Sequence, residues 1–189
     1  MAIEKLKANL IKQMLERGIL DLKKVLEIDA KKGRIAIRGE RMLLTSSLGF
    51  ANLHGSVEKI AGKAAPAIIR AYGGSCAKRD FIGVWKAWLP DLKVETVLSL
   101  FPAIYSTVGW GKVVDVSLAE DGGRIIFKNC FEADAVLKIY GKRDSPQCHF
   151  MTGYLGVLYG EMTRKDWQVS ETKCEAKGDE YCEFTFEAR

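Results

Sequence analysis

The sequence predicts an α+β fold in which an antiparallel sheet, built from hairpins, packs against a block of helices. Three observations indicate this class. Glycine-containing turns separate short apolar runs on both sides of a central region, apolar residues recur at helical spacing between about 48 and 108, and two strand-like segments joined through Gly178 close the chain. With 189 residues, 48% of them hydrophobic, the chain can bury a core of its own.

Residues 1–29 are predicted to be a helical extension that precedes the main domain, residues 30–189. A helix over 3–17 carries apolar residues at helical spacing, namely Ile3, Leu6, Leu10 and Met14, and Gly18 follows as its C-cap. This amphipathic helix can pack on its own domain or on a partner, and packing on its own domain is the favoured reading. A first hairpin is predicted next, with strands over 34–38 and 42–46 on either side of Gly39-Glu40.

The middle of the chain is predicted to be helical. Leu53, Val57 and Ile60 share one helical face, and Ala64, Ile68 and Tyr72 share another after Gly62 interrupts the pattern. Two consecutive helices follow from this. A third helix is expected over 81–89, and a fourth over 97–108, bent or started anew at Pro102.

The remainder is predicted to alternate strands and helices. A second hairpin has strands over 114–118 and 124–127 around Asp121-Gly122-Gly123. Helices are expected over 132–140 and 148–162. Strands over 168–174 and 181–186 then end the domain.

The overall charge excludes little. The chain is mildly basic, with a formal net charge of +5, and its lysines are scattered, so direct nucleic-acid binding is not predicted. No apolar stretch resembles a secretory signal or a membrane span, which predicts a soluble, cytoplasmic protein. Gly109-Trp110-Gly111 precedes a strand and is therefore no dinucleotide fingerprint, and no phosphate-binding loop is present, so an enzyme is not the favoured reading.

Three of the five cysteines lie in the last 42 residues. Cys174 and Cys182 are equidistant from Gly178, so a turn centred there places them opposite each other with Cβ atoms about 5 Å apart. Such a pair can form a disulfide or share a metal ion; the alternative is that these cysteines are simply buried.

A metal ion is favoured over a disulfide because a cytoplasmic compartment is reducing. Cys148 begins a predicted helix, whose positive end stabilises a thiolate, and three thiolates select zinc over calcium or magnesium. The fourth ligand stays open between two residues. His149 is chemically the better zinc ligand and is slightly ahead, whereas Glu171 points away from Cys174 on a flat strand and requires a bulge.

The stretch from Cys148 to Gly156 and the Glu171-x-x-Cys174…Cys182 spacing resemble the 4-vinyl reductase domain family. Supporting similarities lie at Gly39, Gly73-Gly74 and Gly109-Trp110-Gly111, so the resemblance spans about residues 30 to 187. It implies an α+β fold related to a trafficking-complex (TRAPP) subunit and a homodimer. It also implies a structural zinc on Cys148, Glu171, Cys174 and Cys182, as in the input domains of phenol-sensing bacterial regulators.

The resemblance further implies a buried pocket for a hydrophobic or aromatic small molecule. The aromatic residues available to line it are Trp85, Trp88, Phe101, Tyr105, Trp110, Phe127, Phe150 and Tyr154. Phe127 stands where phenol-sensing relatives have Trp, and their upstream His is missing, so the ligand class is predicted without specifying phenol. The expected function is ligand sensing, as in transcription regulation, through the dimer or a separate output protein. The alternative is an accessory or reductase-like protein of tetrapyrrole metabolism, and a dimeric scaffold without a ligand is a third reading.

Overall fold

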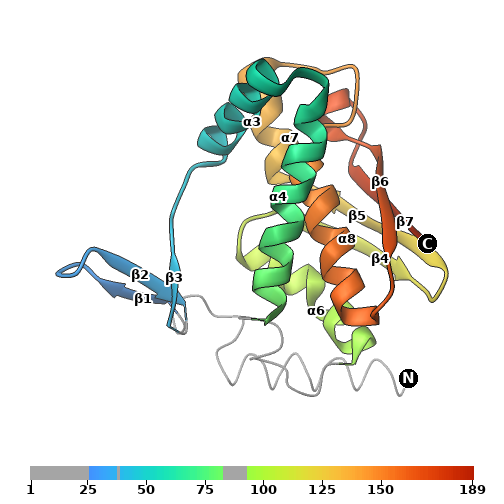
Figure 1. The fold of residues 1–189 in the computed structure, drawn as a ribbon, viewed down its shortest axis with the longest axis horizontal. Helices are drawn as coiled ribbons and strands as arrows, with labels where there is room; N and C mark the ends of the chain where they lie inside the picture. The colour runs from blue at the N-terminus through green and yellow to red at the C-terminus, as the bar shows by residue number, and fades with distance from the viewer. Residues whose placement is uncertain (1–25, 38, 83–92) are drawn as a thin grey trace.

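The computed structural model describes residues 26–37, 39–82 and 93–189 (Figure 1). The predicted helix over 3–17, most of the predicted helix over 81–89, and the side chains of Trp85 and Trp88 lie outside these residues. Within the described part of the chain, no helix has the length and apolar character needed to cross a membrane.

The main sheet has four antiparallel strands in the order β4-β5-β7-β6. Its strands are β4 (Lys112–Leu118), β5 (Gly122–Lys128), β6 (Trp167–Lys173) and β7 (Cys182–Ala188). The hairpins β4–β5 and β6–β7 meet where β5 pairs with β7, and Phe127 lies opposite Cys182 there. Helices α7 (Phe131–Tyr140) and α8 (His149–Thr163) connect β5 to β6. The predicted α+β class with hairpin-built antiparallel sheets is confirmed.

A layer of helices covers this sheet (Figure 1). It contains α3 (Ser47–Ala61), a 3-10 turn (Gly62–Ala64), α4 (Ala65–Asp80) and α6 (Val94–Thr107). The break between α3 and α4 falls at Gly62, as predicted, because its φ of 55° ends the first helix. Pro102 lies inside α6 without ending it.

Two glycines let α4 and α8 approach until their backbones touch. A Cβ atom on Gly153 would lie 2.0 Å from the carbonyl oxygen of Arg70, and one on Gly73 would lie 2.2 Å from that of Phe150. The smooth glycine face predicted for the helix over 148–162 is therefore a helix-packing surface at Gly153. Beneath it, α8 and the sheet share a core formed by Met151, Leu155, Leu158, Ile125, Phe127, Phe184 and Phe186.

Helical spacing identified α3 correctly, but the apolar face that it singled out is not the buried one. Leu53 and Ile60 are 51% and 88% exposed, whereas Ala51, His54 and Gly55 face the interior. Gly55 is buried because the Tyr140 side chain of α7 occupies the space beside it. Small side chains, which carry little hydrophobic signal, thus determine how α3 packs.

A second antiparallel sheet, β1-β2-β3, forms an arm that projects from the rest of the molecule (Figure 1). Its strands are β1 (Leu26–Asp29), β2 (Arg34–Ile37) and β3 (Glu40–Met42). The first predicted hairpin is present, but its second strand begins at Glu40 because Ile37 pairs with Glu40. The additional strand β1 was not predicted. An exposed ion pair of 2.9 Å between Glu40 and Arg79 links the arm to α4.

Candidate functional site

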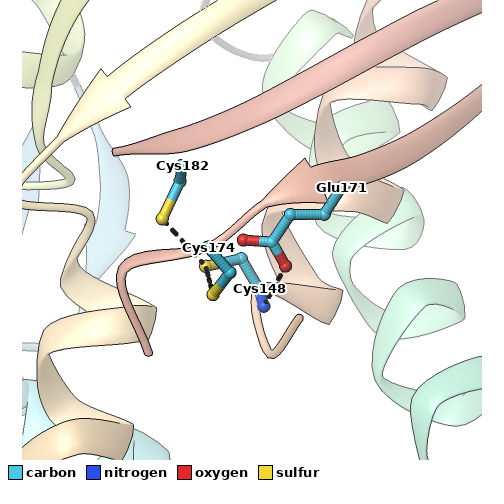
Figure 2. A group of neighbouring side chains, drawn as sticks. All are labelled: Cys148, Glu171, Cys174 and Cys182. Carbon is cyan, nitrogen blue, oxygen red and sulfur yellow. Dashed lines mark hydrogen bonds between the residues drawn. The ribbon is translucent and has the colours of Figure 1, made fainter. Parts of the chain in front are cut away.

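Four potential metal ligands converge from separate places in the chain (Figure 2). Cys148 precedes α8, Glu171 lies in β6, Cys174 follows β6, and Cys182 begins β7. One ligand atom from each of the four lies within 4.8 Å of the other three. The three cysteines are buried, and all five cysteines are free thiols, so the predicted disulfide alternative is not found.

The sulfur atoms are spaced as metal coordination requires. Cys148 Sγ lies 3.7 Å from Cys182 Sγ and 4.0 Å from Cys174 Sγ. In a tetrahedral site with metal–sulfur bonds of about 2.3 Å, the sulfurs lie about 3.8 Å apart. The cluster can therefore hold a metal ion with little rearrangement.

A β-bulge brings Glu171 to the cluster. Glu171 pairs with Phe184 but Lys173 pairs with Glu183, so Thr172 is an extra residue on β6. On a flat strand, Glu171 and Cys174 would point to opposite faces. The bulge removes the objection that strand periodicity raised against Glu171, and it leaves Cys174 and Cys182 in the symmetric relation that their spacing about Gly178 predicted.

The two oxygens of Glu171 have different surroundings. Oε2 accepts a 2.8 Å hydrogen bond from the backbone N–H of Cys148, whereas Oε1 is buried with no hydrogen-bond partner among the described residues. Leaving a carboxylate oxygen buried and unpaired is costly. Oε1 is thus the atom that a metal ion would engage, and Glu171 instead of His149 completes the group.

The electrostatics of the cluster call for a cation. Burial, and then the charge of Cys174, raises the pKa of Glu171 to about 10. Hydrogen bonds from Cys148 and Cys182 lower the pKa of Cys174 to about 2, while burial holds the pKa of Cys148 well above its ordinary value. Without a positive ion, the cluster can carry little more than one negative charge, and a bound divalent metal would allow the other ligands to ionise.

Sequence reasoning missed the groups that surround this cluster. Cys130 Sγ lies 3.7 Å from Cys148 Sγ. The buried carboxylate of Glu132 accepts the backbone N–H groups of Phe150 at 2.9 Å and Met151 at 3.0 Å, so it caps the first turn of α8. His54 Nε2 lies 3.5 Å from Glu132 Oε1. An acidic residue at the start of a predicted helix was the only local signal, and it does not reveal a partner about 18 residues away.

The six described residues of the predicted pocket lie together in one aromatic cluster. Ring-centroid distances are 5.1 Å for Phe101–Tyr105, 5.4 Å for Tyr105–Phe127, 4.7 Å for Trp110–Tyr154 and 5.6 Å for Trp110–Phe150. These residues come from α6, β5 and α8 and the turn that follows α6. Phe50 and Phe131 also join the cluster through Phe150.

Polar atoms lie within this apolar surrounding. The hydroxyl of Tyr105, in a side chain only 2% exposed, has no hydrogen-bond partner among the described residues. The Tyr154 hydroxyl donates a 2.9 Å hydrogen bond to Asp80. Burial raises the pKa of Asp80, and burial together with the charge of Asp80 raises the pKa of Tyr105. The cluster therefore has hydrogen-bonding groups that a ligand could use.

With the site described, comparison with known proteins identifies its class. Residues 126–188 match the family model of the 4-vinyl reductase domain, and this part of the chain is such a domain. The match contains all four cluster residues and confirms the family resemblance indicated by the cysteine spacing. The chain is also 33% identical over 91 residues, 48% of its length, to the uncharacterized protein MJ0150 of Methanocaldococcus jannaschii, and it spans half of that protein.

Solved structures share the fold. The phenol-responsive sensory domain of the transcription activator PoxR, solved with phenol, superimposes with a TM-score of 0.76 at 20% identity over 92% of this chain and 90% of that domain. A trafficking protein particle complex subunit 3 from Naegleria fowleri, covalently bound to palmitic acid, matches with a TM-score of 0.52 at 14% identity. This second match covers 76% of this chain and 95% of the subunit. The predicted relation to the TRAPP-subunit fold is confirmed.

Proposed function

We propose that this protein is a small-molecule-sensing domain whose ligand is an aromatic compound with a hydrogen-bonding group, and whose fold is held by a structural zinc ion. Residues 30–189 form the sensing domain in this proposal, and residues 1–29 are an extension. One observation carries the ligand assignment: the buried Tyr105 hydroxyl lies among aromatic rings with no protein partner among the described residues. Buried hydroxyls ordinarily have a partner, so a ligand group is the natural one.

The proposed ligand class extends what is known of PoxR, whose sensory domain responds to phenol. This chain has Phe127 where a hydrogen-bonding side chain was expected by resemblance, and it has Tyr105 and the Tyr154–Asp80 pair nearby. A hydroxyl on an aromatic ring could accept a hydrogen bond from Tyr105 while its ring stacks within the cluster.

The metal is proposed to be zinc because three thiolates and one carboxylate form a set that suits a borderline-soft divalent ion. All four positions of a tetrahedral site would be filled by Cys148, Glu171, Cys174 and Cys182. No position would remain for a reactive water, which supports a structural role. Such an ion would join β6, β7 and the start of α8.

Signal output is proposed to pass through a homodimer or a separate output protein. The extended link between the arm and α3 leaves Leu43 86% exposed and Leu44 76% exposed. Adjacent exposed leucines on a projecting segment are typical of a surface that another chain covers. A second copy of this chain is the occupant that the family resemblance favours.

Calorimetric titration tests the ligand assignment. Phenol should bind the purified protein more tightly than toluene, which has the same ring and a methyl group in place of the hydroxyl. Tyr105→Phe should abolish that preference and leave the melting temperature of the free protein nearly unchanged. Equal affinity for both compounds, or a preference that survives in Tyr105→Phe, would contradict the proposal.

Native mass spectrometry tests the remaining parts together, since one measurement reports bound metal, bound small molecule and subunit number. We expect one zinc per chain and a dimer. Material free of zinc after purification without chelators would refute the metal assignment. A visible absorbance band from a co-purified pigment would favour the alternative role in tetrapyrrole metabolism.

A further inference from the structure

A second candidate site lies on the surface, away from both the metal ligands and the aromatic cluster. A cleft of about 750 Å³ is bordered by the glycine face of α8, the first three residues of β6 and Arg70 of α4. Gly153, Gly156 and Gly160 form the helical side, and the opposite side is the segment 167–169. The proposed sensing function uses none of these residues.

The strand that borders this cleft is at the edge of the sheet. β6 pairs with β7 on one side, and no described strand pairs with its other side. The backbone N–H of Arg189 donates to the carbonyl oxygen of Asp166 at 3.1 Å, which fixes the alternation along the pair. Trp167 and Val169 therefore direct their backbone N–H and C=O groups toward the open edge. An open edge of this kind is a template for an added strand.

The rim of the cleft is predominantly basic. Its cations are Arg70, Arg164, Lys165 and Arg189, and its only acidic residues are Glu161 and Asp166. Glu161 already faces Lys78 at 3.7 Å. Arg70 and Arg164 form no ion pair with any residue that the structure describes, so their charges are available to a partner.

We propose that an extended, acidic segment of another protein binds this cleft by adding a strand to β6. The open backbone groups of Trp167 and Val169 would hydrogen-bond to the segment, and its carboxylates would face Arg70 and Arg164. A second copy of this chain is a poor occupant, because pairing β6 with β6 would bring two basic rims together. The same surface provides a route by which a sensing domain can contact a separate output protein.

Fluorescence anisotropy with a labelled peptide of alternating Glu and Val residues tests this proposal. The full chain should bind this peptide, and it should not bind the matching peptide of alternating Lys and Val. Charge reversal in Arg70→Glu/Arg164→Glu should weaken binding at least tenfold. The control Lys31→Glu/Lys63→Glu changes the net charge equally on exposed residues outside the cleft, and it should weaken binding far less.

A second pair of variants separates strand addition from simple charge attraction. Val169→Pro removes the outward N–H and is compatible with an edge strand, whereas Val169→Ala keeps the N–H. We expect Val169→Pro to lose binding and Val169→Ala to retain it, with both variants showing the circular dichroism spectrum of the parent chain. Equal binding by the two variants would overturn strand addition. Unchanged binding by Arg70→Glu/Arg164→Glu would overturn the assignment of the cleft.

Discussion

Substituting Gly153 by Ala tests how closely α4 and α8 must pack. The new Cβ would lie 2.0 Å from the carbonyl oxygen and 2.6 Å from the carbonyl carbon of Arg70. Both atoms belong to the backbone, so no side-chain rotation can relieve the overlap. To reach the 3.4 Å of ordinary contact, the two helices must separate by about 1.4 Å.

The magnitude follows from two opposing terms. Overpacking a tightly fitted interior costs about 1–3 kcal/mol, and a backbone clash belongs at the upper end of that range. Replacing Gly by Ala inside a helix returns up to about 1 kcal/mol. The net loss should be about 2 kcal/mol in the free energy of unfolding. For a chain of this size, that corresponds to a melting temperature lower by about 4–8 °C.

Urea denaturation and thermal melting measure this effect, and Gly156→Ala on the same helix is the matched control. A Cβ on Gly156 would meet the Val169 Cγ2 atom at 3.1 Å, and a side-chain methyl group can give way. Gly156→Ala should therefore change stability by less than about 0.5 kcal/mol. The packing argument fails if Gly153→Ala melts with the parent protein, or if Gly156→Ala is the more damaging of the two.

Three further predictions concern buried polar groups. Removing zinc with a chelator should lower the melting temperature of the parent chain but leave Cys174→Ser unchanged; an equal shift in both would remove the structural role from the metal. Glu132→Ala leaves the two N–H groups at the start of α8 without an acceptor, which should cost about 2–3 kcal/mol in urea denaturation, whereas Glu132→Gln keeps one acceptor oxygen and should cost less. Burial lowers the pKa of His54 from 6.5 to about 4, so the unfolded chain binds a proton there that the folded chain does not. Stability should therefore decrease as pH falls from about 6.5 to 4, and His54→Gln should flatten that dependence.

Much of the fold could be predicted because its signals are local. Hydrophobic spacing and glycine punctuation placed the helices near α3, α4, α7 and α8, and the turns near both hairpins of the main sheet. The equal separation of Cys174 and Cys182 from Gly178 likewise needs only the geometry of an antiparallel pair. Each of these inferences concerns residues within one element or one turn.

Features that depend on contacts between distant segments could not be predicted from spacing. The buried face of α3 is formed by Ala51, His54 and Gly55, whose small or polar side chains give a weak hydrophobic signal. The approach of Cys130 to Cys148, and of Glu132 to the start of α8, depends on how α7 packs against α8. For Glu171, strand periodicity alone gave the wrong preference, because a bulge at Thr172 reverses the direction of the side chain.

Glu171 explains why the metal centre, the bulge and α8 belong to one structural unit. Its Oε2 atom is occupied by the Cys148 N–H, and its Oε1 atom is the one left for a metal. A bound ion would therefore fix the strand β6 and the start of α8 through the same carboxylate. Phe150 lies two residues after Cys148 and contacts Trp110 and Tyr154, while Cys182 pairs with Phe127 across the sheet. The metal ligands thus hold two sides of the aromatic cluster, so losing the ion should loosen the proposed ligand site before it unfolds the rest of the sheet.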